Sequence, residues 1–258
     1  MTLETSKTPR KASILAAANI VKQYSGAAKP ALDGFTLQVA EGQIVGLLGP
    51  NGAGKTTAVS ILSTLMRPTT GQLSIMGADA MGSRGRIRQN IGLAPQDIAL
   101  YESFSVRENL LYFGRMYGLK GAALQGRVAT CLEAVGLTPQ ADQRVAVFSG
   151  GMKRRANLAA AIIHAPRLLF LDEPTVGVDA QSRALIMDLR AGLKRDGTAM
   201  VYTTHYMEEA ETLCDTVAIM DVGQIIVEGA PANLIASHPE ADSLGALFLQ
   251  LTGRTLRD

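Results

Sequence analysis

A glycine-rich loop near the start of the chain has the residue types that bind a polyphosphate. Residues 49–57 read Gly-Pro-Asn-Gly-Ala-Gly-Lys-Thr-Thr, which matches the pattern G-x-x-x-x-G-K-[ST]. Glycines allow the backbone to wrap phosphate groups so that N–H groups point toward them. We expect Lys55 to reach the β- and γ-phosphates and the Thr56 hydroxyl to ligate Mg²⁺. The loop therefore predicts a nucleotide site.

Two adjacent carboxylates much later in the chain could complete this chemistry. The apolar run 168–171 ends in Asp172 and Glu173. An aspartate at the carboxyl end of such a strand can hold Mg²⁺ through water beside a phosphate loop. Glu173 is placed to polarise the attacking water as a general base. The alternative is a strand that ends in a solvated acidic turn, which the presence of the phosphate loop disfavours.

A third motif, Ser149-Gly150-Gly151-Met152, precedes those carboxylates. Serine is a good N-cap, and two glycines permit an anion to approach the start of the following helix. Taken alone, the motif is better read as an ordinary helix cap after a loop.

The elements that must position these motifs follow an α/β pattern. Apolar strands are expected at 43–48, 168–171 and 199–204, and helices at 55–66 and 182–194. Residues 13–45 alternate short apolar runs with turn signals, which is typical of antiparallel strands. We predict a mostly parallel sheet, an N-terminal antiparallel β subdomain and an inserted helical subdomain at about 97–165. One domain spans 13–237, between a flexible leader (1–12) and a tail (238–258) with a short helix.

Composition excludes several classes of protein. The chain has 258 residues, 47% of them hydrophobic, which excludes a wholly disordered protein. A formal net charge of +2 argues against a dedicated nucleic-acid binder, so no nucleic-acid partner is expected. Cys131 and Cys214 fit neither a disulfide framework nor a metal signature. We find no apolar run long enough to span a membrane.

In this order and spacing, the three motifs resemble the nucleotide-binding subunit of ATP-binding cassette (ABC) transporters, over about residues 13–237. The resemblance implies a P-loop NTPase core in which two such domains pair head to tail and sandwich two ATP molecules. The phosphate loop (Walker A) of one would face Ser149, Gly150, Gly151 and Met152 of the other. The usual signature is Leu-Ser-Gly-Gly-Gln, and Met152 cannot hydrogen-bond as that glutamine would. Ser149 and the backbone donors remain.

The resemblance also implies roles for single residues. Tyr24 would stack on adenine, and Asp179 belongs to a D-loop that crosses the dimer interface. Gln96 would contact Mg²⁺ and water, and His205 would hydrogen-bond the γ-phosphate. The catalytic set is therefore Glu173, His205 and Gln96, and the Mg²⁺ set is Thr56, Gln96 and Asp172. The expected ATP contacts are Tyr24, Gly49, Pro50, Asn51, Gly52, Ala53, Gly54, Lys55, Thr56 and Thr57.

The residues in and around the motifs are similar to those of the drug-resistance branch of exporter ATPases, which work with separate type-2 permeases. This implies a motor subunit on the cytoplasmic face of the inner membrane, bound to a multi-span permease and to a second copy of itself or a paralogous ATPase. An importer ATPase or a soluble ABC ATPase with no transport role remains an alternative. DNA-repair and chromosome members of the family carry a long coiled coil between the phosphate loop and the signature. Here Lys55 and Ser149 are only 94 positions apart, with no heptad pattern between them, which disfavours that class. The transported substrate is left open.

Overall fold

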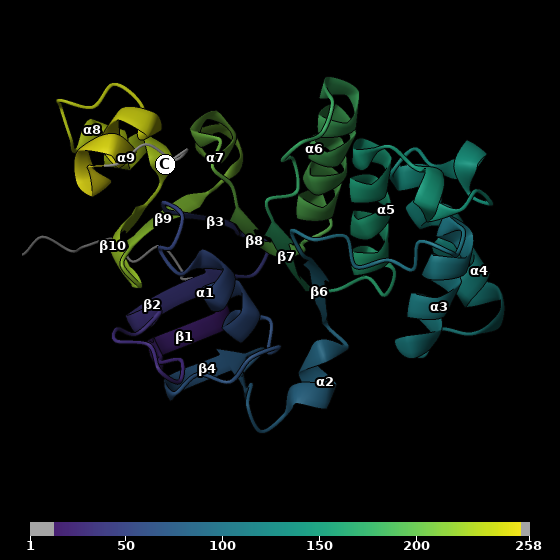
Figure 1. Ribbon diagram of the computed structural model, residues 1–258, viewed down its shortest axis with the longest axis horizontal. Helices are drawn as coiled ribbons and strands as arrows, with labels where there is room; N and C mark the ends of the chain where they lie inside the picture. The colour runs from purple at the N-terminus through teal and green to yellow at the C-terminus, as the bar shows by residue number, and fades with distance from the viewer. Residues whose placement is uncertain (1–12, 254–258) are drawn as a thin grey trace, which may run out of the picture.

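The protein has an α/β fold built on two sheets (Figure 1), which confirms the predicted fold class. The structure, a computed structural model, describes residues 13–253. The predicted leader, 1–12, and residues 254–258 lie outside the described residues. Within the described range, no helix is long and apolar enough to cross a membrane.

The larger sheet carries the site. Its strands are β3 (Ile44–Leu48), β6 (Ile91–Ala94), β7 (Leu168–Asp172), β8 (Ala199–Thr203), β9 (Thr216–Asp221) and β10 (Gln224–Gly229). Their spatial order is β10-β9-β3-β8-β7-β6, and all pairs are parallel except β9 with β10. Strands β3, β7 and β8 are buried along their whole length, as parallel strands covered on both faces must be.

The smaller sheet is antiparallel and lies at the lower left of Figure 1. Its strands are β1 (Ser13–Lys22), β2 (Leu32–Ala40), β4 (Thr70–Ile75) and β5 (Ala78–Asp79), in the order β2-β1-β4-β5. Strand β1 pairs with both β2 and β4, and β4 pairs with β5.

The helices separate into groups around the larger sheet. On one face, α1 (Lys55–Leu62) and α2 (Arg84–Arg88) lie with the smaller sheet, and on the other lie α6 (Ala180–Arg195) and α7 (Met207–Leu213). The group on the right of Figure 1 consists of α3 (Val106–Met116), α4 (Gly121–Ala134) and α5 (Gly150–Ile162), with 3₁₀ turns at Thr138–Gln140 and Val145–Val147. The chain ends with α8 (Pro231–Ala236) and α9 (Leu244–Thr252), which pack on each other and on α7.

Two hydrophobic cores lie on opposite faces of the larger sheet. Along β3, Val45 and Leu47 join the core that α1, α2 and the smaller sheet cover, whereas Ile44 and Leu48 join the core of the remaining helices. Successive strand residues point to opposite faces, so one short strand supports both cores. This double burial holds the carboxyl edge of the sheet in place.

The helix predicted to run to about Met66 ends at Leu62, so that boundary was wrong by one turn. Thr64 has a φ of 65°, outside the helical region. Its carbonyl oxygen accepts a 2.7 Å hydrogen bond from the Arg88 guanidinium. This tertiary contact, which no local pattern announces, draws the chain out of the helix.

Candidate active site

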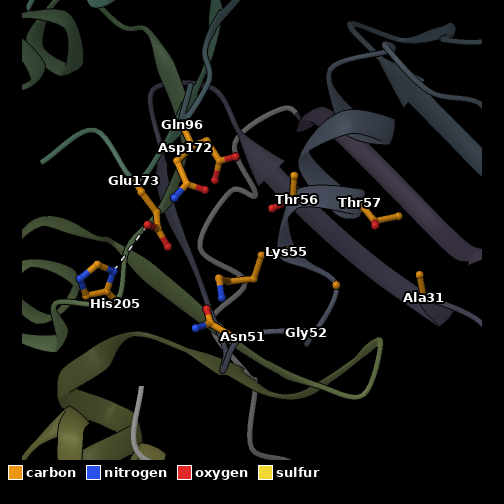
Figure 2. Close-up of a pocket in the computed structure, with 11 residues that line it drawn as sticks. Ala31, Asn51, Gly52, Lys55, Thr56, Thr57, Gln96, Asp172, Glu173 and His205 are labelled. Carbon is orange, nitrogen blue, oxygen red and sulfur yellow. Dashed lines mark ion pairs between the residues drawn. The ribbon is translucent and has the colours of Figure 1, made fainter. Parts of the chain in front are cut away.

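A cleft of about 500 Å³ lies beside α1, at the carboxyl edge of the larger sheet (Figure 2). Parallel strands end at one edge, so segments far apart in the sequence meet there. The cleft is lined by Ala31, Asn51, Gly52, Gly54, Lys55, Thr56, Thr57, Gln96, Asp172, Glu173 and His205. Its volume lies in the range of small-molecule and cofactor sites.

The phosphate loop connects β3 to α1 and leaves backbone donors free. Gly54, the N-cap of α1, has a φ of 103°, and no side chain caps the first turn of the helix. A Cβ at Gly54 would lie 2.5 Å from the carbonyl oxygen of Ala31, so only glycine fits. The uncapped N–H groups and the positive end of the helix dipole suit an anion.

Three residues of the predicted ATP set belong to this loop but face the protein interior. Gly49, Pro50 and Ala53 are buried and do not line the cleft. A Cβ at Gly49 would lie 2.7 Å from the carbonyl oxygen of Met220, so this position sets the close packing of the loop on β9. The other predicted loop residues, 51, 52 and 54–57, line the cleft.

Lys55 bends back over its own loop. Its Nζ donates to the carbonyl oxygens of Gly49 at 2.6 Å and Pro50 at 3.1 Å. Burial lowers the pKa of Lys55, and the carboxylates of Glu173 and Asp172 oppose that shift. A desolvated ammonium facing two carboxylates is suited to exchange the carbonyls for phosphate oxygens.

Asp172 is a buried carboxylate, 6% exposed, at the end of β7. Thr203 Oγ1, directly across from it on β8, donates a 2.5 Å hydrogen bond to Oδ1. Burial raises the pKa of Asp172, and the nearby Glu173 carboxylate adds to this, while the Thr203 bond and the charges of Lys55 and Arg154 oppose it. Such a group favours a cation beside it.

Glu173 and His205 face each other across the cleft, as the dashed line in Figure 2 shows. Glu173 Oε2 lies 3.6 Å from His205 Nδ1, and the side chains are 13% and 26% exposed. Glu173 has a φ of 49°, an unusual conformation for a residue with a side chain. Its N–H donates to Thr203 Oγ1 at 3.0 Å. Sequence reasoning missed Thr203, whose one hydroxyl contacts both acidic residues.

Gln96 lines the cleft on the loop after β6, and α5 anchors that loop. The Arg154 guanidinium donates to the carbonyl oxygen of Gln96. Asn157 Nδ2 donates to Pro95 O at 3.2 Å, and Asn157 Oδ1 accepts from the N–H of Ala99 at 3.1 Å. The sequence motif hinted at Arg154 only as a basic residue, and nothing local singled out Asn157.

Tyr24 lies beside the cleft without lining it. Its hydroxyl is 3.2 Å from Thr57 Oγ1, and its ring is 40% exposed. Lys22 Nζ lies 5.4 Å from the ring centroid. The exposed ring is accessible to a stacking partner.

The segment 149–152 does not reach the phosphate loop of the same chain. Ser149 caps α5 by accepting the N–H of Met152 at 3.3 Å, and both Ser149 and Gly150 are exposed. A Cβ at Gly151 would lie 2.5 Å from Asp179 Oδ2, so this segment packs on the start of α6. Asp179 in turn caps α6 by accepting the N–H of Ser182 at 2.8 Å.

Residues 32–176, more than half of the chain, match the ABC transporter family. The chain belongs to the ABC transporter family. It is an ABC ATPase, in accordance with the match and with the residues that line the cleft. The recognition made from the three motifs is therefore confirmed.

Curated relatives of this ABC ATPase include proteins named for resistance and export. It is 43% identical to the linearmycin resistance ATP-binding protein LnrL of Bacillus subtilis, over 86% of this chain and 70% of that protein. It is 41% identical to the doxorubicin resistance ATP-binding protein DrrA of Mycobacterium tuberculosis, over 92% and 70%. It is 42% identical to the Nod factor export ATP-binding protein I of Burkholderia orbicola, over 87% and 73%.

Solved structures similar to the ABC ATPase share most of its fold. An ATP-binding subunit of an ABC transporter superposes with a TM-score of 0.85 at 28% identity, over 92% of this chain and 99% of that one. A dimeric ATP-binding cassette in a post-hydrolysis state, bound to ADP and Pi, superposes with a TM-score of 0.77 at 25% identity, over 84% and 98%.

Proposed function

We propose that this ABC ATPase is the motor subunit of an exporter. It binds Mg-ATP between two head-to-tail copies, or between itself and a paralogous ATPase, and drives a multi-span type-2 permease on the cytoplasmic face of the inner membrane. The observation that carries the proposal is the convergence of Lys55, Gln96, Asp172, Glu173 and His205 on one cleft. The names of the resistance and export relatives support the direction of transport.

The donor set of the cleft fits Mg²⁺ held jointly with a nucleotide. Thr56, Gln96 and Asp172 offer a hydroxyl, an amide and a carboxylate oxygen, the hard donors that Mg²⁺ prefers. Among the described residues, no cluster of three His, Cys, Asp or Glu side chains could hold a metal by itself. This fits an ion that completes its coordination with phosphate oxygens and water. When bound, Mg²⁺ neutralises charge on the phosphates.

The residues of the cleft then divide the work of hydrolysis. Lys55 and the N–H groups at the start of α1 hold the β- and γ-phosphates. Glu173 accepts a proton from the attacking water, and His205 positions the γ-phosphate opposite it. The reacting groups act mainly through position and charge in a partly buried cleft. Tyr24 supplies a stacking surface for the adenine ring.

Exposure of the segment 149–152 supports the dimer. Its cap residue and first glycine are exposed, and it lies away from the phosphate loop of its own chain. A head-to-tail copy would bring these donors, with the start of α6, to the γ-phosphate bound by its neighbour. Met152 leaves that contact to Ser149 and to backbone N–H groups.

The Glu173→Gln variant tests the proposal. We expect it to bind ATP with near wild-type affinity, to hydrolyse it at least ~100-fold more slowly, and to accumulate as an ATP-dependent dimer in light scattering. Rapid turnover in this variant would refute the role of Glu173 as general base.

The same variant can identify the partner. Tagged and expressed in its host, with ATP present during solubilisation of the membranes, it should co-purify with a multi-span permease. Recovery with an extracytoplasmic binding protein as well would favour the importer alternative. Recovery with cytosolic partners only would refute the transporter proposal, although the proposed ATPase chemistry would be unaffected.

A further inference from the structure

Glu209, on α7 and four residues after His205, gathers hydroxyl groups from the segments that border the cleft. Its Oε2 accepts three hydrogen bonds, from the hydroxyls of Thr175 at 2.9 Å, Tyr202 at 2.8 Å and Thr204 at 3.3 Å. The first donor lies two residues after Glu173, and the last immediately precedes His205. One carboxylate oxygen therefore ties together the backbone segments that carry the Glu173–His205 pair.

The other oxygen of this carboxylate lacks a hydrogen-bond partner. Glu209 Oε1 is buried and makes no hydrogen bond to any described residue, and the same is true of Arg183 Nε. These two atoms are 3.8 Å apart. A charge-assisted N–H···O bond is ~2.8 Å long, so a relative shift of about 1 Å would form one. Two complementary groups whose facing atoms are buried but stop just short of a hydrogen bond indicate a contact made in another state of the protein.

Arg183 is also connected to His205 by the ring of Tyr206, which contacts both side chains. Its guanidinium carbon lies 4.8 Å from the Tyr206 ring centroid, and that ring lies 4.4 Å from the His205 ring. Arg183 sits in the first turn of α6, whose cap is Asp179. The start of α6 is therefore linked mechanically to the histidine of the cleft.

We propose that Arg183 and Glu209 are positioning residues that form a latch between α6 and α7. In the closed, ATP-bound dimer, Arg183 Nε donates to Glu209 Oε1, and the bond holds His205 and Glu173 in their catalytic arrangement. The inference rests on the proposed head-to-tail dimer, in which contact of the partner with the Asp179 segment shifts α6. It explains how assembly of the dimer is transmitted to the reacting groups of each cleft.

A merely structural role for the latch has a different signature. If the pair only stabilised the fold, its loss would lower the melting temperature and leave the turnover of the folded protein unchanged. A positioning role lowers kcat and leaves the KM for ATP nearly unchanged, because phosphate-loop binding does not pass through α6 or α7.

Steady-state ATPase assays of Arg183→Met, Glu209→Gln and the double variant test the latch. We expect kcat to fall about tenfold or more in each single variant, with KM within about twofold of wild type. Both substitutions remove the Arg183–Glu209 bond, and Glu209→Gln in addition weakens the acceptor of the three hydroxyl bonds. The double variant should therefore be no slower than Glu209→Gln. Glu208→Gln is the matched control, because Glu208 is an exposed neighbour on the same helix, and it should retain wild-type kcat.

The outcomes separate the latch from the proposed function. Wild-type kcat in Arg183→Met, or strictly multiplicative losses in the double variant, would overturn the latch. If Glu209→Gln does not fold, Arg183→Met still decides, since 42% of that side chain is exposed and the substitution spares the three hydroxyl bonds. A wild-type protein without ATPase activity or ATP-dependent dimers would overturn the proposed function instead.

Discussion

The carboxylate of Asp172 is buried, where a negative charge is disfavoured. Burial raises its pKa above the ordinary value of 3.8, and the Thr203 hydrogen bond with Lys55 and Arg154 offsets this only in part. An acid whose folded pKa is raised contributes stability below its unfolded pKa, and that contribution is lost as pH rises through the folded pKa. At neutral pH the charged carboxylate therefore destabilises the nucleotide-free protein, and its retention is explained by the cation it is proposed to hold.

We predict that Asp172→Asn stabilises the nucleotide-free protein and inactivates it. Removing the buried charge should raise the melting temperature by ~2–4 °C, which corresponds to about 1 kcal/mol for a chain of this size. Mg²⁺-dependent phosphate release should fall at least ~100-fold, since one metal-holding oxygen is lost. The control is Asp188→Asn, an exposed aspartate on α6 whose removal should change neither quantity. A lower melting temperature in Asp172→Asn would contradict this account of the site.

At the scale of elements, α5 connects two parts of the proposed site with the helical group and with β6. Its first turn carries the 149–152 segment, and its middle holds the Gln96 loop through Arg154 and Asn157. Just beyond its end, the His164 ring stacks on Tyr117 of the α3–α4 turn at a centroid distance of 3.6 Å. His164 Nε2 lies 2.9 Å from the Ile91 carbonyl oxygen at the start of β6.

The burial of His164 predicts how the stability of the protein changes with pH. Burial lowers the pKa of His164 from 6.5 to about 4. A histidine with a depressed folded pKa contributes stability above its unfolded pKa, and this is lost as pH falls from 6.5 through about 4. We expect urea denaturation to show a loss on the order of 2 kcal/mol over that window from this group. His164→Gln should lower stability at pH 7 and flatten that part of the curve; a parallel curve would contradict the assignment.

At the scale of the whole molecule, the cleft lies at the carboxyl edge of the larger sheet, and the exposed 149–152 segment does not line it. A single copy thus presents two incomplete halves of the proposed site. The proposed dimer makes one complete cleft from the phosphate loop of one copy and the 149–152 segment of the other. This arrangement has a consequence for mixtures of variants.

We predict that two inactive variants restore activity when mixed. Lys55→Ala disables the phosphate loop, and Ser149→Arg disables the opposing segment. In an equal mixture, half of the dimers are mixed, and each of those has one intact cleft, so up to about a quarter of wild-type activity should return. ATP hydrolysis measured after subunit exchange checks this, and Lys55→Ala mixed with Glu173→Gln, defects of the same half, is the control. No recovery above that control would contradict a head-to-tail site.

Much of this protein could be read from short stretches of its sequence. The glycine-rich loop and the apolar run before Asp172 are each local. The end of α1 was misjudged because the Arg88 bond to Thr64 spans separate segments. Thr203, Asn157 and Glu209 were missed for the same reason, since only the pairing of distant elements brings them into contact with the segments that border the cleft.

The sequence by itself determined the kind of chemistry, because the conformation of a phosphate loop and the burial of a strand depend on residues within a few positions of each other. The tertiary structure alone decided how the reacting groups are oriented. The parallel register that sets Asp172 opposite Thr203, and the approach of Arg183 to Glu209, are contacts between elements. Such contacts follow from packing around two cores, and packing depends on every element at once rather than on any local pattern.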